Sequence, residues 1–216
     1  MKLIIGNKNY SSWSLRPWLL LRAAGIEFEE VLIPLYREDS KARQLAYSPA
    51  GKVPALIDGE ITVWDSLAIV EYLAEKFPDR GIWPRDPAAR TRARSICAEM
   101  HSGFPALRNS MPMNLRGRHP GCGRTPETLA DIARIVAVWE DCRAYFGAGG
   151  AFLFGAFCAA DVFYAPVVTR FVTYDVQLPP TAAAYRDAVL ALSALREWTA
   201  AGATEPERIA MSELYA

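Results

Sequence analysis

The first 14 residues contain a hydroxyl-rich turn that could stabilise a thiolate. The turn runs from Tyr10 to Ser14, follows an apolar run over residues 3–5, and precedes a helical run that begins near Leu15. At a helix N-terminus, unpaired backbone N–H groups and the helix dipole favour an anion. A serine there either donates a hydrogen bond to a bound anion or simply caps the helix, and the turn alone leaves both interpretations open.

A second feature is Val53-Pro54, at the start of an expected strand. Proline is placed at the first residue or the edge of a sheet because it has no N–H to donate. A cis bond here would turn the N–H and C=O of Val53 outward, ready to pair with an extended peptide. The alternative is a trans proline that only begins a strand.

The third feature is Asp65-Ser66, immediately before an amphipathic helix. Ser66 offers a hydroxyl and an N–H to a carboxylate, and Asp65 offers its carboxylate to an ammonium group. The alternative is that Asp65 caps the helix and does nothing more.

Together, the three features predict a site for a small zwitterionic peptide that carries its own thiol. Asp65 and Ser66 would hold one end, Val53 the middle, and the thiol would face Ser11 or Ser12. Lowering a thiol pKa from about 8.5 by about two units needs roughly 2.7 kcal/mol, which a hydrogen bond to the anion plus the helix dipole can supply. The serine would act as a donor, because no histidine in the first 100 residues can deprotonate it.

The elements that must position these residues follow from the pattern of apolar and turn residues. We expect a strand over 2–6, a helix with Pro17 in its first turn and Gly25 after its end, a strand over 28–33, and a weak helix or irregular segment over 38–46. A hairpin follows around Asp58-Gly59, then an amphipathic helix from Asp65 to Phe77. The order β-α-β-α-β-β-α predicts an α/β domain over residues 1–78.

After a linker over residues 79–86, strand patterns cease and the chain over 87–216 is predicted to be an all-α domain. We expect a long helical stretch over 87–115, bent or ended near Pro105 or Pro112, and further helices over 127–146, 161–174, 182–192 and 194–201. The apolar residues on every side of 161–174 predict a helix in the centre of a bundle. The last dozen residues are expected to be a loose tail.

The segments Ser48–Leu56 and Asp65–Ile69 closely resemble the glutathione-binding segment of the cytosolic glutathione S-transferases. The serine turn resembles the serine-type classes, nearest to the zeta pattern of two serines and a cysteine. The resemblance implies a thioredoxin-like N-terminal domain, an all-α C-terminal bundle, a cis Pro54 and a homodimer. It also implies glutathione as co-substrate and a small electrophile as second substrate. The catalytic residue would be Ser11, with Ser12 next and Tyr10 third, and the glutathione-binding residues would be Trp13, Lys52, Val53, Pro54, Asp65 and Ser66.

The departures from the zeta pattern leave three functions open. Trp13 stands where that pattern has cysteine, which argues for a glutathione transferase over a maleylacetoacetate-type isomerase. A non-catalytic transferase-like binding protein is the second alternative. A turn without cysteine argues against glutaredoxin- or omega-type redox chemistry. The predicted second-substrate pocket comprises Tyr10, His101, Phe104, Arg108 and Met111, with Met100, Asn114, Arg170 and Tyr174 as further candidates.

Composition restricts the classes of partner, the cellular compartment and the metal sites that we expect. The 24 basic and 24 acidic residues cancel, which argues against a nucleic-acid or anionic-membrane partner. The four cysteines are sparse, as expected for free thiols, and the N-terminus shows no leader pattern, so we expect a cytoplasmic protein. No metal is expected, because Cys97, His101, His119 and Cys122 match no structural zinc spacing.

Overall fold

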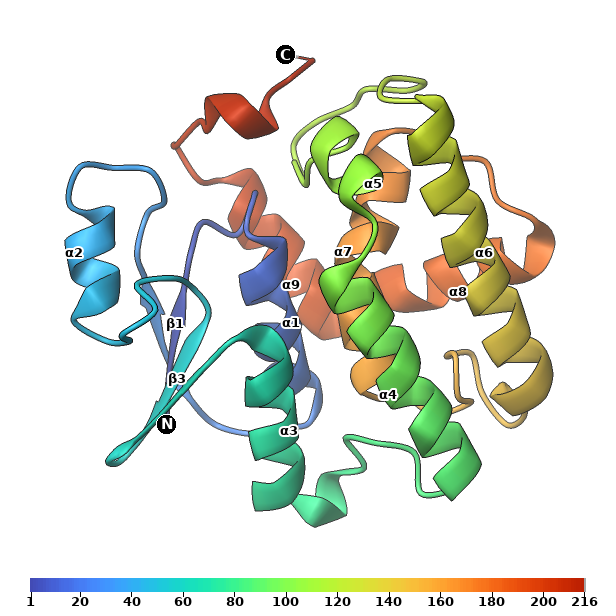
Figure 1. Ribbon diagram of the computed structural model, residues 1–216, viewed down its shortest axis with the longest axis horizontal. Coiled ribbons are helices and arrows are strands. Elements are labelled where there is room, and N and C mark those ends of the chain that lie inside the picture. Colours follow the sequence, from blue (N-terminus) through green and yellow to red (C-terminus); the bar gives the residue numbers. More distant parts are fainter. Residues whose placement is uncertain (216) are drawn as a thin grey trace.

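The computed structural model describes residues 1–215, which form an α/β part followed by an all-helical part (Figure 1). The α/β part runs β1 (Lys2–Ile5), α1 (Ser12–Ala23), β2 (Glu29–Leu32), α2 (Ser40–Leu45), β3 (Ala55–Asp58), β4 (Ile61–Trp64) and α3 (Ser66–Lys76). The helical part contains α4 (Pro87–Ser102), α5 (Pro105–Ser110), α6 (Pro126–Phe146), α7 (Ala159–Thr173), α8 (Pro180–Leu190) and α9 (Ser193–Ala203). The predicted fold, a thioredoxin-like α/β domain followed by a helical bundle, is confirmed.

The four strands form a mixed sheet in the order β2-β1-β3-β4. β1 pairs in parallel with β2 and antiparallel with β3, and β3 continues antiparallel into β4 across the Asp58-Gly59 turn. Gly59 has φ +59°, a left-handed conformation that glycine adopts without a Cβ clash. Leu3, Ile4 and Ile5 are buried. The central position of β1 carries the chain directly into the serine turn.

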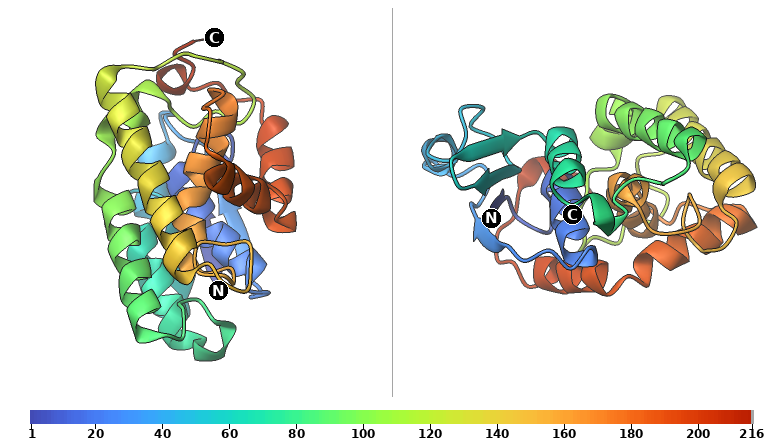
Figure 2. Two further views of the ribbon diagram at one scale, coloured as in Figure 1. Left: turned by 90° about the vertical axis from the view of Figure 1, so that its right-hand side faces the viewer. Right: turned by 90° about the horizontal axis from the view of Figure 1, so that it is seen from below.

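Helix α1 lies between the two parts of the molecule (Figure 1 and the right panel of Figure 2). It packs on α3 and the sheet on one side and on α7 and α9 on the other. The helix begins at Ser12, so Pro17 lies in the second turn, slightly later than the predicted first turn, and cannot donate to the Trp13 carbonyl. Gly25, at φ +63°, follows its end as predicted. The serine turn therefore begins a helix that both halves of the chain hold in place.

Helix α7 is the centre of the helical bundle, with nearly every residue buried. At its start, the carboxylate of Asp161 accepts from the N–H groups of Cys158 at 2.8 Å and Leu153 at 3.1 Å. Burial raises the pKa of Asp161 to about 6, and the backbone donors oppose that rise. The carboxylate thus satisfies backbone donors that would otherwise be unpaired in the core.

The helical stretch expected over 87–115 is interrupted near Pro105, one of the two predicted positions: α4 ends at Ser102, and Phe104 turns into the left-handed region at φ +60° before Pro105 starts α5. The prediction of a loose tail is wrong. The two carboxylate oxygens of Glu205 accept from the N–H groups of Lys8 and Asn9, and the Tyr215 hydroxyl donates to the Ser110 carbonyl at 2.8 Å. Residues 205–215 therefore pass across the molecule from the α/β part to α5.

The division into domains over residues 1–78 and 87–216, joined by a linker over 79–86, remains a prediction. A short 3-10 turn over Pro78–Arg80 and an irregular segment lead into α4 within this stretch. Within residues 1–215, no helix combines the length and the apolar character needed to cross a membrane.

Candidate functional site

The Ser11 hydroxyl caps α1. Its oxygen accepts from the N–H of Ser14 at 3.3 Å, and its hydrogen is donated to the Ser14 hydroxyl at 2.7 Å. Ser14 in turn accepts from the N–H of Gly6 at 3.0 Å. This chain of bonds ties the end of β1 to the start of α1, and it uses both the donor and an acceptor position of Ser11.

The Ser12 hydroxyl has a different environment. It stands at the first residue of α1, and its oxygen accepts from Nη2 of Arg170 at 3.4 Å. Arg170 is itself buried on α7, where its other nitrogens donate to the carbonyls of Met111 and Pro166. A hydroxyl that accepts from a cation is a stronger donor to an anion. Ser12 therefore combines a helix N-terminus, a nearby positive charge and a hydrogen available for donation.

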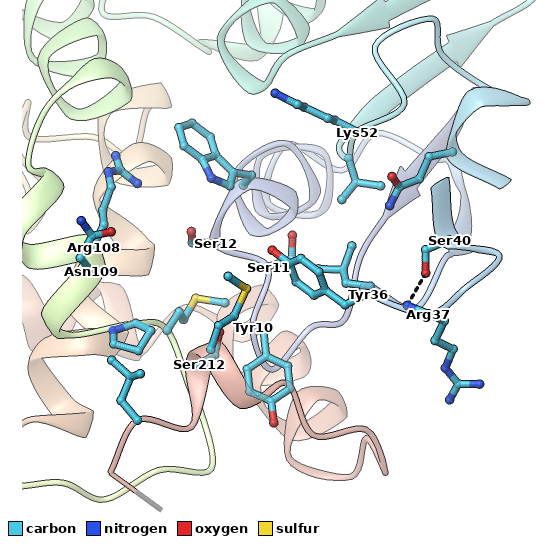
Figure 3. A pocket seen from close by; sticks show the side chains of 18 of the residues that line it. Tyr10, Ser11, Ser12, Tyr36, Arg37, Ser40, Lys52, Arg108, Asn109 and Ser212 are labelled. Atoms are coloured by element: carbon cyan, nitrogen blue, oxygen red, sulfur yellow. Dashed lines mark hydrogen bonds between the residues drawn. The ribbon is translucent and has the colours of Figure 1, made fainter. Parts of the chain in front are cut away.

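Both serines border a cavity of about 810 Å³ that lies against the start of α1 (Figure 3). One wall comes from the α/β part and contains Leu35, Tyr36, Arg37, Ser40, Lys41, Gln44, Lys52 and Val53. The facing wall comes from the helical part and contains Arg108, Asn109, Pro112, Met113 and Arg170. Met211, Ser212 and Leu214 of the tail complete the lining. The cavity is large enough for a tripeptide and a second small molecule.

Tyr10 faces the cavity with its ring, but its hydroxyl points away from the serines and toward the tail (Figure 3). The hydroxyl donates to the Glu213 carboxylate and accepts from Nη2 of Arg116 at 2.6 Å. Burial, and next the bond to Glu213, raise the pKa of Tyr10. Tyr10 therefore fastens the tail at the mouth of the cavity, and its hydroxyl is not free to meet a thiol.

The Val53-Pro54 bond is cis, as the resemblance implied. Val53 lines the cavity, beside Lys52.

Asp65 caps α3 in a conformation that is rare for any residue but glycine, at φ +74°. Its Oδ1 accepts from the N–H of Leu67 at 2.8 Å, and its Oδ2 lies 3.2 Å from Nε2 of His101. Ser66 is buried, and its hydroxyl accepts from Nη1 of Arg16 at 3.3 Å. Strained backbone of this kind concentrates at ligand sites, where surrounding contacts hold it.

Three arginines without an acidic partner lie at or next to the cavity: Arg108 and Arg170 line it, and Arg16 packs behind Trp13. Arg16 stacks 4.4 Å from the Trp13 ring, and Arg108 lies 4.9 Å from the same ring. None of the ion pairs that arginines form within residues 1–215 involves Arg16, Arg108 or Arg170. Burial, followed by repulsion from the neighbouring arginines, lowers the pKa of Arg16 and of Arg170 to about 9, so both remain charged at neutral pH. The site carries an excess of positive charge.

The structure brings most of the predicted site residues together. Tyr10, Ser11, Ser12, Trp13, Lys52, Val53 and Arg108 line the cavity. Asp65 and His101 form a pair in contact with Trp13, since the rings of His101 and Trp13 lie 5.2 Å apart. Phe104 and Met111 lie in the hydrophobic core instead. Phe104 stands in the turn between α4 and α5 and Met111 directly after α5, and both side chains are buried at these helix ends.

Several residues of the site gave no signal in the sequence. In the sequence, Arg16 has the pattern of any residue in a helix. The structure shows that it is buried between the rings of Trp13 and Phe163. The cavity residues of the tail carry no motif. The unequal roles of Ser11 and Ser12 also depend on contacts with Ser14 and Arg170, which no local pattern encodes. Residues 1–215 contain no group of three or more His, Cys, Asp or Glu side chains placed to hold a metal ion.

Comparison with known proteins gives consistent results. The profile of the glutathione S-transferase N-terminal domain matches residues 10–76. A zeta-class glutathione S-transferase from Euphorbia esula is 31% identical over 176 residues, covering 78% of this chain and 77% of that protein. A probable maleylacetoacetate isomerase from Caenorhabditis elegans is 36% identical over 105 residues. The matches span about half the length of the first curated relatives, 48% of the nematode protein and 55% of the maleylacetoacetate isomerase from Pseudomonas aeruginosa.

Solved structures share the fold at lower identity. A Burkholderia glutathione transferase homologue with bound glutathione has a TM-score of 0.69 at 22% identity, covering 93% of this chain and 96% of that one. The holo structure of a bacterial maleylpyruvate isomerase of the zeta class has a TM-score of 0.68 at 24% identity, covering 97% of this chain and all of that one. At these identities the similarity establishes the architecture.

Proposed function

Since the chain belongs to the glutathione S-transferase family, we propose that it is an enzyme that binds glutathione in the described cavity and adds its thiolate to a small electrophile. The observation that carries the proposal is the convergence of three segments that are distant in sequence. The α1 N-terminus and Val53 line the cavity, and Asp65 at the start of α3 is linked to it through His101, whose ring contacts the cavity residue Trp13.

The binding roles follow from charge and hydrogen-bonding capacity. Asp65 would receive the ammonium group of the γ-glutamyl end, because its carboxylate is half-exposed and held at the start of α3. The Ser66 N–H and the helix N-terminus suit the neighbouring carboxylate. Val53 suits the peptide backbone, Lys52 the carboxylate at the other end of the tripeptide, and Trp13 and Pro54 would shape the wall between them. This arrangement directs the thiol toward Ser11 and Ser12.

For the thiol donor, the sequence favoured Ser11, whereas the hydrogen bonds favour Ser12. Ser11 donates its hydrogen to Ser14, whereas the Ser12 oxygen accepts from Arg170 and its hydrogen can be donated to sulfur. A hydrogen bond to a charged acceptor contributes about 1.5–3 kcal/mol, enough to lower the thiol pKa by about one to two units. Arg170 adds a positive charge on the same side.

A glutathione-dependent isomerase is the second candidate function, and the arginines support it. Arg108 and Arg170 line the cavity without an acidic partner, so a second substrate with one or two carboxylates would gain charge-assisted hydrogen bonds there. Transferase and isomerase begin with the same addition of thiolate to an electrophilic carbon. In the transferase the sulfur stays bound to that carbon. In the isomerase the addition turns a carbon–carbon double bond into a single bond, which rotates before the sulfur is expelled and the double bond re-forms.

Turnover with a chloronitrobenzene and with maleylacetone separates the two activities. Arg170→Met, a substitution of similar volume that removes the charge, should raise the KM for maleylacetone and leave the KM for the uncharged chloronitrobenzene nearly unchanged. Calorimetric titration with glutathione tests the third possibility, a transferase-like binding protein without turnover, because that protein would bind glutathione and convert neither substrate.

We further propose a cytoplasmic homodimer with a domain boundary within residues 79–86. β4 is an edge strand of the sheet, and its residues Ile61 and Trp64 expose 51% and 45% of their surfaces, which suits an edge covered by a second copy of the chain. Sedimentation equilibrium measures the mass in solution. A monomer at micromolar concentration would contradict the dimer.

A further inference from the structure

The contact between His101 and Asp65 connects the two parts of the molecule at the proposed ammonium site. His101 belongs to α4, and Asp65 caps α3. Their Nε2 and Oδ2 atoms are 3.2 Å apart. Because Leu67 already donates to the other oxygen of Asp65, the carboxylate is held from two directions. The contact with His101 therefore adds a second restraint to a half-exposed side chain that the N–H of Leu67 holds at its other oxygen.

The surroundings of His101 favour its neutral form. The charged groups that face it are Asp65 at the start of α3, Arg16 on α1 and Arg108 on α5, while α7 contributes only the Phe163 ring. Burial lowers the pKa of His101 first, the two arginines lower it further, and Asp65 opposes them. Its Nδ1 atom is buried and has no hydrogen-bond partner within residues 1–215. A proton on Nδ1 would therefore be a buried donor without an acceptor.

We propose that His101 is a positioning residue for the ammonium group of glutathione: in its neutral form it donates from Nε2 to Asp65 and orients the carboxylate, and in its protonated form it competes with the ammonium group for that carboxylate. The inference rests on the proposed function, since it needs Asp65 to bind the ligand's ammonium. Two cations on one carboxylate repel each other, so ligand binding and protonation of His101 oppose one another.

The proposal predicts that the affinity for glutathione depends on pH and that this dependence requires the amino group of the ligand. Glutathione should bind the wild-type protein about three- to ten-fold more weakly near pH 5.5 than near pH 7.5, because part of the protein must lose a proton from His101 before the ammonium group can bind. A tripeptide analogue that lacks only the amino group, glutaryl-cysteinyl-glycine, should bind with little change over the same range. Both ligands carry the same thiol, so ionisation of sulfur contributes equally to both.

Isothermal titration of both peptides into the wild type, His101→Gln and His101→Leu tests the proposal. Glutamine places its amide nitrogen near the position of Nε2 and cannot take up a proton. His101→Gln should therefore bind glutathione within about two-fold of the wild type near pH 7.5 and lose the pH dependence. His101→Leu should bind glutathione roughly five- to twenty-fold more weakly at that pH and bind the deaminated peptide normally. Thermal melts verify that each variant is folded.

The second histidine provides a matched control. His119 packs against Tyr174 and Tyr215, away from Asp65, so His119→Gln should keep the wild-type pH profile. The proposal is overturned if His101→Gln keeps the pH profile of glutathione binding, or if the deaminated peptide shows the same profile in the wild type. A wild-type protein that binds glutathione at neither pH would instead overturn the proposed function itself, and the two failures are thus distinguishable.

Discussion

Replacing Ser12 with alanine should raise the pKa of the glutathione thiol in the complex while leaving the protein's stability nearly unchanged. The Ser12 hydroxyl accepts from Arg170 at 3.4 Å and has no other hydrogen bond within residues 1–215. Ser12 and Arg170 both line the cavity, where water can replace the lost acceptor, so removal of the hydroxyl costs the fold little. The bound thiolate, in contrast, loses a donor. A hydrogen bond to a charged acceptor is worth about 1.5–3 kcal/mol, which corresponds to a rise of about one to two pKa units.

Ser11→Ala is the matched comparison and should behave in the opposite way. It removes the acceptor for the Ser14 N–H and the bond to the Ser14 hydroxyl, so the variant loses a helix cap. We expect a loss of about 1 kcal/mol and a decrease in Tm of about 3 °C. The pKa of the bound thiol should move by less than in Ser12→Ala.

Titration of the thiolate's ultraviolet absorbance in the complex measures the pKa directly, and the pH profile of kcat/KM gives an independent value. At neutral pH, turnover of Ser12→Ala should fall roughly ten-fold with little change in the dissociation constant of glutathione. The reasoning is refuted if Ser11→Ala raises the thiol pKa and Ser12→Ala does not. That result would return the donor role to Ser11.

Three further predictions concern the start of α7 and the tail over residues 205–215, which hold the parts of the site in place. Burial raises the pKa of Asp161 to about 6, so the folded protein holds that proton more tightly than the unfolded chain does. The free energy of unfolding of the wild type should therefore fall by about 2–3 kcal/mol relative to that of Asp161→Asn as the pH rises from about 4 to 6. Urea unfolding at several pH values measures this difference, and parallel curves for the two proteins would contradict the prediction. Cys158→Ser places a stronger acceptor at the start of α7 and should raise stability by about 1 kcal/mol, so a thermal melt without a gain counts against the prediction. Tyr10→Phe loses the bond to Glu213 and should speed amide exchange in residues 205–215, measured by mass spectrometry, while unchanged exchange would mean that the other contacts suffice.

The fold could be predicted because strong local signals coincide with its element ends. Asp58-Gly59 sets the hairpin, Gly25 ends α1, and prolines begin α4, α5, α6 and α8. Pro105 indicated a break close to the end of α4, but the left-handed conformation of Phe104 could not be predicted, because phenylalanine has no preference for it. The anchored tail was missed for a related reason. Its glutamates bind partners that lie far away in sequence.

The part of the site proposed to bind glutathione could be predicted because its segments carry their own signals, whereas Arg108 and Arg170 were named only as candidates for the second-substrate pocket. Val53-Pro54 and Asp65-Ser66 are local features of the sequence, and the structure places them near the serine turn. The arginines are different, because Arg16, Arg108 and Arg170 lie on three helices and converge only through packing. Periodicity cannot tell a buried arginine from a solvated one. The charge of the second-substrate region is therefore a property of the folded protein alone.

The tail also sets the order in which a working pocket can be assembled during translation. Tyr10 and Glu213 are separated by 203 positions, so the ribosome releases the hydroxyl long before the carboxylate that receives it. The sheet and α1 can fold on the nascent chain, yet the wall formed by Met211, Ser212 and Leu214 is still unmade at that stage. A partly synthesised chain consequently presents the serine turn beside an incomplete wall, and the cavity described above is complete only after residues 205–215 have emerged.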